Sequence, residues 1–335
     1  MLFERWNFEL KFRNLVLRKR SIGQETTITH ETCKITTGGF KMNLQEIITV
    51  KGATDLHIHS APCLFPRIAD DVEMALEARR LGMHAIALKS PFESTVGRAY
   101  HAGKQVPGIS VYGGLVLNNW TGGINPSAVS KTLKMGGKLI WMPTFDSAYH
   151  AKVYGGTGKY KEKSMRVESL SQEGISIVKD GELTKQAKDV VDLVKQYDAI
   201  LGTGHISEDE IRALVGYGAS IGEAKIVITH PDWPTPGVGI DFLKEMAKQE
   251  AIAEFCASSI GPLTYFLPPT KGKEYIDILG AENIILSSDC GVAFYPMPME
   301  FLRVFASCLY ESGVSVEQLN QMMIHNPKRL LGIEK

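Results

Sequence analysis

The stretch Asp55-Leu56-His57-Ile58-His59-Ser60 carries two histidines separated by one apolar residue. Thr54, Leu56 and Ile58 suit a β-strand, and Ser60-Ala61-Pro62 ends it. Side chains two residues apart on a strand point the same way, so both imidazoles could reach one metal ion. Two ordinary strand histidines would give the same pattern, and residues further along the chain decide between these interpretations.

The composition is that of a globular protein. The chain has 335 residues, 44% of them hydrophobic, which is enough for a sizeable core. Basic and acidic residues are both 37 in number, so the net charge gives no electrostatic case for nucleic-acid binding. No apolar run approaches about 18 residues, so we expect no membrane span. The five cysteines are scattered without a CxxC pair, which favours the reducing cytoplasm over a disulfide framework.

Residues 1–42 differ from the rest of the chain. The segment mixes basic and acidic residues and lacks the apolar core and cleavage site of a signal peptide. We therefore interpret it as an N-terminal extension that need not belong to the native core, with Met42 as an alternative start. A short strand-rich flap is the other interpretation. We expect no catalysis from it.

From residue 43 to residue 335, apolar strand segments alternate with helical segments, which is typical of βαβ units in a parallel sheet. Eight strands with helices between most of them favour a (β/α)8 TIM-like barrel. The predicted strands cover residues 53–59, 84–89, 109–117, 138–142, 199–204, 225–229, 251–256 and 283–288. The predicted helices cover residues 70–81, 126–135, 184–197, 208–216, 240–249, 298–312 and 315–323. An insertion after strand four, residues 145–183, ends in a predicted hairpin at 179–181 and resembles a lid or binding loop.

Candidate metal ligands end several of these strands. His57 and His59 end the first strand, and His205, His230 and Asp289 end the fifth, sixth and eighth. In parallel barrels the active site lies at the C-terminal ends of the strands, so these side chains should meet at one mouth. Imidazole and carboxylate ligands suit Zn²⁺ or a similar divalent ion. Each residue alone is more simply a loop histidine or a turn cap, but together they predict a metal site.

This order of ligands resembles the amidohydrolase superfamily of metal-dependent hydrolases. The resemblance covers about residues 50–330 and rests on the motifs DLHIHS, TGHIS, ITHP and SSDCG. Within that superfamily, the chain looks like an uncharacterised branch. The resemblance implies a metal at the mouth of the barrel, a hydroxide nucleophile, and hydrolysis of an amide, cyclic amide or lactone bond in a small molecule.

The chain departs from the superfamily pattern at strand four. Two-metal members commonly place a carboxylated lysine or a Glu there, whereas this strand ends Trp141-Met142-Pro143-Thr144. Lys89 instead ends the second strand within an apolar run, where a lysine is costly unless it is neutralised or paired. Carboxylation would make Lys89 a bridging anionic ligand between two ions. The alternatives are a substrate-binding ammonium group and an ion pair with an acid such as Glu254.

Without a bridging Lys89, one ion held by His57, His59, His205 and Asp289 is the simpler arrangement, with His230 free to polarise the substrate. In either case the ion would lower the pKa of its water to about 7. Asp289 would accept the proton and return it to the leaving group. Candidates for substrate contact are Arg67, Arg98, Tyr149, Lys152 and Trp233.

Two other functions fit parts of the sequence. A phosphoesterase of the histidinol-phosphatase-like type also opens with a DxHxH strand, but it expects a further His or acid after strand two, and Lys89-Ser90-Pro91-Phe92 lacks one. A non-catalytic metal-binding barrel is the third hypothesis, because fold does not fix function. The apolar residues 294–299 would suit either a homo-oligomer contact or the wall of a pocket.

Overall fold

The computed structural model describes residues 36–37, 40–41, 48–160, 166–167, 173–222 and 224–333. The chain divides into two units, Met1–Ile47 and Ile48–Lys335. In the first unit the described residues are two short antiparallel strands, β1 (Thr36–Thr37) and β2 (Phe40–Lys41). The rest of the predicted extension lies outside the described residues, so its relation to the native core stays a prediction.

The parallel strands of the second unit form a six-stranded sheet, β13-β12-β11-β10-β7-β6, and a three-stranded sheet, β3-β4-β5. β5 and β6 are two halves of one predicted strand, separated by Gly113, so the two sheets continue into each other. These strands are β3 (Thr54–Ile58), β4 (Ala85–Leu88), β5 (Ser110–Tyr112), β6 (Gly114–Val116), β7 (Leu139–Trp141), β10 (Ile200–Gly202), β11 (Lys225–Thr229), β12 (Ile252–Cys256) and β13 (Ile284–Ser287).

The first and last strands of the series meet just beyond their C-terminal ends. Ile58 and Cys290 form an isolated parallel bridge, and the Asp289 amide donates to the His57 carbonyl at 2.9 Å. Gly291 allows this approach, because a Cβ there would collide with the carbonyl oxygen of His59, and its φ of 135° is in a region that L side chains rarely adopt. The strand order is that of the predicted (β/α)8 barrel, and this junction joins two of the strand ends that carry candidate ligands.

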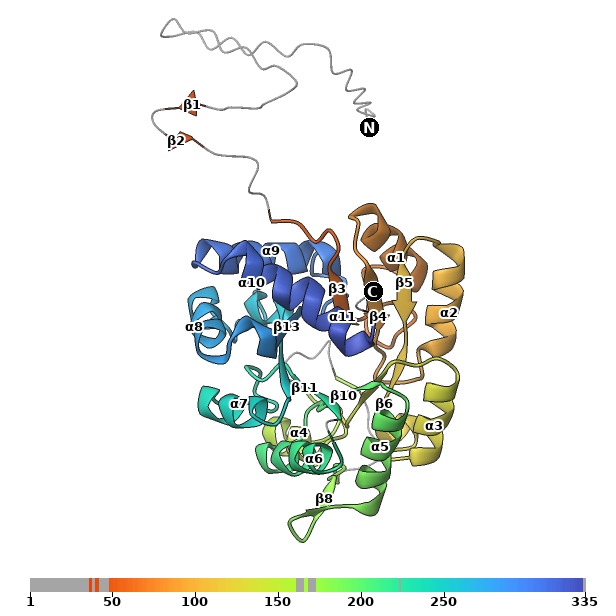
Figure 1. Cartoon of the computed structure of the whole chain (residues 1–335). Coiled ribbons are helices and arrows are strands. Elements are labelled where there is room, and N and C mark those ends of the chain that lie inside the picture. Colours follow the sequence, from red (N-terminus) through yellow and green to blue (C-terminus); the bar gives the residue numbers. More distant parts are fainter. Residues whose placement is uncertain are drawn as a thin grey trace, which may run out of the picture. The chain divides into compact units, whose positions relative to one another are not determined.

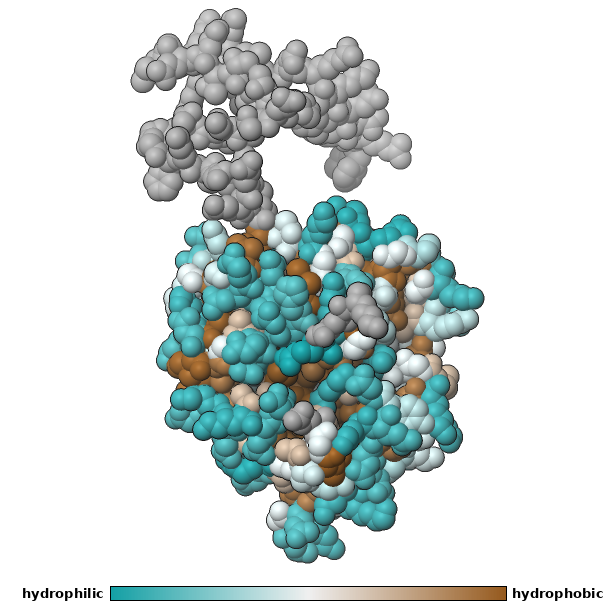
Figure 2. Space-filling view, viewed as in Figure 1, coloured by the Kyte–Doolittle hydropathy of each residue, from teal (hydrophilic) through white to brown (hydrophobic). Residues whose placement is uncertain are grey.

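Helices surround these strands in the second unit (Figure 1). They are α1 (Asp71–Arg80), α2 (Val96–Gln105), α3 (Pro126–Lys134), α4 (Ala148–Tyr154), α5 (Lys185–Gln196), α6 (Glu208–Ser220), α7 (Ile240–Ala247), α8 (Pro269–Leu279), α9 (Pro298–Glu311), α10 (Val316–Asn320) and α11 (Asn326–Leu331). The face in Figure 2 carries mostly hydrophilic residues with scattered hydrophobic ones, as expected where helices turn their apolar sides to the strands. No helix of the described residues is long and apolar enough to span a membrane.

The hydrophobic core has two layers. One cluster packs the outward side chains of the strands against the helices. A second cluster fills the barrel with residues such as Leu56, Trp141 and Ile285, and it includes Leu330 and Leu331 of α11. The insertion contains α4 and the predicted hairpin, formed by β8 (Val178–Lys179) and β9 (Glu182–Leu183). Cys63, Cys256, Cys290 and Cys308 are free thiols.

Candidate metal centre

β3 is irregular where it carries its two histidines. Its register against β4 shifts between Asp55 and Ile58, so one stretch of the strand departs from strict alternation. Leu56 packs in the interior cluster, and the neighbouring His57 also turns inward, with its ring centroid 6.2 Å from that of Trp141. The rings of His57 and His59 lie edge to face, with centroids 5.3 Å apart. The predicted pair of inward imidazoles is therefore present, and the bulge is part of how β3 forms it.

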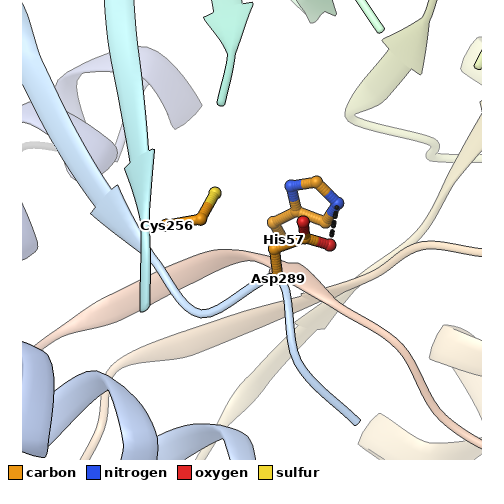
Figure 3. Close-up of side chains that lie close together, drawn as sticks. All are labelled: His57, Cys256 and Asp289. Carbon is orange, nitrogen blue, oxygen red and sulfur yellow. Dashed lines mark ion pairs between the residues drawn. The ribbon is translucent and has the colours of Figure 1, made fainter. Parts of the chain in front are cut away.

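The two imidazoles converge on one carboxylate oxygen. Nε2 of His57 lies 2.9 Å from Oδ1 of Asp289, and Nε2 of His59 lies 3.1 Å from the same oxygen. Figure 3 shows His57 and Asp289 facing each other, with Cys256 on β12 nearby. Asp55 holds the two backbones together, since its carboxylate accepts from the His57 amide at 3.0 Å and from the Ser288 amide at 3.1 Å.

The opposite nitrogen of each ring is held by an acceptor. Nδ1 of His57 lies 3.2 Å from Oε2 of Glu254, and Nδ1 of His59 lies 2.9 Å from the carbonyl oxygen of Lys89. An acceptor at Nδ1 fixes the ring proton there and leaves a lone pair on Nε2. Two such lone pairs aimed at one carboxylate oxygen repel each other unless a cation, or an additional proton on His57, lies among them. The arrangement fits a divalent ion bound by nitrogen and oxygen.

The charges of this cluster depend on one another. Burial lowers the pKa of His57, but Asp289 and Glu254 outweigh burial and Lys89 and raise that pKa to about 9. Burial raises the pKa of Asp289, yet His57 and His59 hold it well below the usual range. Burial and the nearby Arg67 lower the pKa of His59 to about 3. The cluster thus retains one positive charge beside Asp289, at the place where the ligands would hold an ion.

His205 is oriented by a histidine of the insertion. Nδ1 of His205 lies 2.9 Å from Nδ1 of His150 on α4, and Nε2 of His150 donates to the Lys159 carbonyl at 2.8 Å. Because His150 carries its proton on Nε2, its Nδ1 accepts from His205 and leaves the Nε2 lone pair of His205 free. Ser147 caps α4 and also donates to the His205 carbonyl at 2.7 Å. The sequence offered no signal for this partner, because His150 lies within the insertion.

His230 has no hydrogen bond to its Nδ1 among the described residues, although that atom is buried. Its ring lies 5.0 Å from the ring of His205 and 6.2 Å from that of His57, measured between centroids. His230 has a φ of 30° and Asp289 a φ of 47°, both in the left-handed region that non-glycine residues rarely occupy. Such strained backbone is characteristic of functional sites, and here it occurs at the ends of two strands that carry candidate ligands.

Lys89 lies among the histidines. Its Nζ is 2.9 Å from Nε2 of His57 and 5.2 Å from the ring centroid of Trp141. Burial lowers the pKa of Lys89, although Asp289 and Glu254 oppose the shift. The alternative of an ion pair with Glu254 is not found among the described residues, where Glu254 faces His57 instead. Lys89 is therefore close enough to the ligands to join them.

The candidate ligands open into a pocket with about 810 Å³ of empty space, some of it continuous with solvent. His59, Lys89, His205, His230 and Asp289 line the pocket, and six of its other lining residues are aromatic. Of the predicted substrate contacts, Arg67 and Trp233 line the pocket. Phe294 and Tyr295 of the apolar 294–299 segment also line it.

The other predicted substrate contacts lie elsewhere. Arg98 forms ion pairs with Asp71 and Glu93, and Tyr149 and Lys152 are not among the pocket residues. Sequence reasoning also missed Cys256, which lies with His57 and Asp289 in a group able to hold a metal ion. Half-buried Asp232 was missed too. It accepts a hydrogen bond from Ser259, and burial raises its pKa to about 7.

Comparison with known proteins identifies a family and a fold. A profile described as a family of unknown function (DUF6282) matches residues 52–254, and no curated protein matches the chain. A Pseudomonas putida protein described as a candidate 2-pyrone-4,6-dicarboxylic acid hydrolase has a TM-score of 0.55 and 13% identity, covering 85% of this chain and 98% of its own.

Two further structures have similar scores. 2,6-Dihydroxybenzoate decarboxylase from Rhizobium has a TM-score of 0.54 and 11% identity, covering 86% of this chain and 100% of its own. An amidohydrolase from Pseudomonas aeruginosa has a TM-score of 0.53 and 12% identity, covering 84% of this chain and 95% of its own. At such low identity these structures show the fold alone. They confirm the fold that the resemblance to the amidohydrolase superfamily implied.

Proposed function

Because the chain belongs to the family of unknown function DUF6282, whose description names no reaction, we propose a function from the site itself. The protein is a metal-dependent hydrolase that cleaves an amide, cyclic amide or lactone bond of a small molecule. One observation carries this proposal: two Nε2 atoms, each with its opposite ring nitrogen held by an acceptor, meet one Asp289 oxygen at 2.9 and 3.1 Å beside a pocket.

We assign His57, His59 and Asp289 to one ion. His205 and His230 each keep a ring nitrogen without a hydrogen bond to another described residue, and their rings lie 5.0 Å apart between centroids, which suits them to a second ion. Lys89 would join both groups as a carboxylated bridge, and its lowered pKa favours the neutral amine that carboxylation needs. Divalent ions held there, Zn²⁺ being the simplest choice, would lower the pKa of a water molecule and polarise a carbonyl group.

The protein's own groups supply the proton transfers. Asp289 stays ionised at neutral pH and can accept a proton from the attacking water. Its Oδ2 accepts a bond of 3.4 Å from the Ser258 hydroxyl, so the carboxylate is held from both sides. Asp289 then returns the proton to the departing amine or alcohol. In the one-ion arrangement His230, whose Nδ1 is buried without a partner among the described residues, would instead stabilise charge on the carbonyl oxygen.

The test is a hydrolysis screen of the metal-loaded protein with amides, cyclic amides, lactones and phosphate monoesters. We expect turnover of a member of the first three classes. Asp289→Asn should lower its kcat/KM by about 10²- to 10⁴-fold, the usual contribution of general acid–base catalysis. Asp277→Asn is the matched control, because Asp277 pairs with Lys273 on the exposed side of α8.

Three outcomes would contradict the proposal. Turnover of phosphate monoesters alone would establish the phosphoesterase alternative. Release of CO2 from an acid without hydrolysis would make the protein a decarboxylase on the same fold. Metal binding without any turnover of these classes would favour the non-catalytic barrel.

A further inference from the structure

Arg67 lines the pocket and forms no ion pair with another described residue. Its Nε is buried and has no hydrogen-bond partner, and no ion pair of its guanidinium is present in the described part of the chain. Arg80, Arg212 and Arg303, in contrast, each pair with a carboxylate. A buried donor without a partner is costly, so a group from outside the chain is the natural acceptor.

The position of Arg67 is fixed by the structure around it. Arg67 forms an antiparallel bridge with Val292, and the neighbouring Ile68 amide donates to the Gly291 carbonyl at 2.9 Å. These contacts tie its loop to the segment that follows Asp289. The carbon at the centre of the guanidinium lies 5.6 Å from the ring centroid of Phe65, which supports one side of the charge. The guanidinium of Arg67 is therefore held in position beside the candidate ligands. It lies near enough to His59 to lower the pKa of that imidazole.

The remaining walls suit a flat, apolar body. Phe65 and Phe145 lie 5.7 Å apart between ring centroids, and Tyr160 and Trp233 complete an aromatic lining. Aromatic walls hold a flat molecule by stacking, whereas a guanidinium fork pairs best with a planar anion such as a carboxylate. Asp289 does not compete for the guanidinium, because its Oδ1 is engaged by His57 and His59.

We propose that Arg67 is a carboxylate-binding residue and that the substrate is an aromatic or other flat unsaturated acid. Its carboxylate pairs with the guanidinium of Arg67, and its body lies between the aromatic walls. This placement would leave the bond to be cleaved over the candidate ligands. The assignment of the substrate rests on the proposed hydrolase function, but the binding site does not need turnover to be tested.

The experiment measures the affinity of the full-length protein for benzoate and for benzamide, a neutral molecule of the same shape, by isothermal titration calorimetry. We expect benzoate to bind the wild type more tightly than benzamide. Arg67→Gln should weaken the binding of benzoate by about 10- to 100-fold, as expected for the loss of hydrogen bonds to a charged group. The affinity for benzamide should stay unchanged. Arg67→Lys, which keeps the charge but loses the fork, should bind benzoate with intermediate affinity. Arg80→Gln is the control, because Arg80 lies on exposed α1 and pairs with Glu77.

The same titrations with chelator-treated protein separate the two proposals. A preference for benzoate that persists without metal and disappears in Arg67→Gln supports the subsite, whatever the hydrolysis screen gives. A preference for benzoate that requires metal and is retained in Arg67→Gln contradicts the assignment of Arg67 as the carboxylate-binding residue. It leaves the hydrolase proposal intact. Absent benzoate binding, or equal binding of benzamide, also contradicts that assignment. Melting curves of each variant verify that the protein is folded.

Discussion

The chemical state of Lys89 decides how many ions the site can hold. An ammonium group 2.9 Å from Nε2 of His57 would compete with a metal ion for that position, whereas a carboxylated lysine would add an anionic ligand. The sequence identified Lys89 because a lysine at the end of an apolar strand is unusual. It did not identify the neighbour, since contact with His57 depends on the bulge in β3.

We predict that Lys89 is carboxylated in the metal-loaded protein. Protein loaded in ¹³C-bicarbonate should give a carbamate carbon signal by NMR, because burial keeps part of the amine neutral and reactive. Lys89→Met should lack the signal, and Lys185→Met should retain it, since Lys185 is an exposed residue paired with Asp189. A wild type without the signal, holding a single ion, would place Lys89 on the substrate side.

The pKa of His57 gives metal binding a pH dependence. Without metal this imidazole keeps a proton up to about pH 9, and the proton must leave before the nitrogen can bind an ion. Apparent metal affinity should therefore rise with pH, by about tenfold per unit below that value for one released proton. Competition with a chelator dye between pH 6.5 and 8 measures the slope. An affinity independent of pH would show that His57 is not a ligand.

At the scale of elements, the insertion is connected to the site through α4. The hydrogen bonds from the Lys159 carbonyl through His150 to His205 orient a candidate ligand that lies after β10. A sequence can show that an insertion exists, but it cannot show which side chain reaches back. The fixed tautomer of His205 is a consequence of that tertiary contact.

We predict that His150→Ala weakens metal binding or kcat by about 10- to 100-fold, the usual cost of removing a group that orients a ligand. The loss should fall on the second ion, leaving the first bound, which metal titration can resolve. His101→Ala on exposed α2 is the control. Unchanged metal content and unchanged kinetics in His150→Ala would make this contact merely structural.

Elements with clear local signals were predicted well. The capping box formed by Ser207 and Glu210 begins α6 as expected, and the hairpin at 179–181 is present. α2, α4, α8 and α11 were missed, because glycine or proline within or beside them weakens the helical pattern. These helices are stabilised by packing on the barrel, a contribution that local sequence does not reveal.

At the scale of the whole molecule, the order of the strands could be predicted because each reads as an apolar run with a polar end. In a parallel barrel the active site lies at the C-terminal ends of the strands. This rule predicts that five side chains lie together: His57, His59, His205, His230 and Asp289. All except His57 line one pocket, and His57 lies within 2.9 Å of Asp289. The sequence also named Arg67 as a candidate for substrate contact, but it could not show the bridge to Val292 that ties the loop of Arg67 to the segment after Asp289.

The most direct test is the metal content of the purified protein by inductively coupled plasma mass spectrometry. We predict about two divalent ions per chain in the wild type, as in two-metal sites bridged by an anionic ligand. His59→Gln should lower the content, because its Nε2 would no longer face Asp289, and His101→Gln should not. A wild-type protein that holds no metal after expression in metal-rich medium would contradict the assignment of these residues to a metal centre.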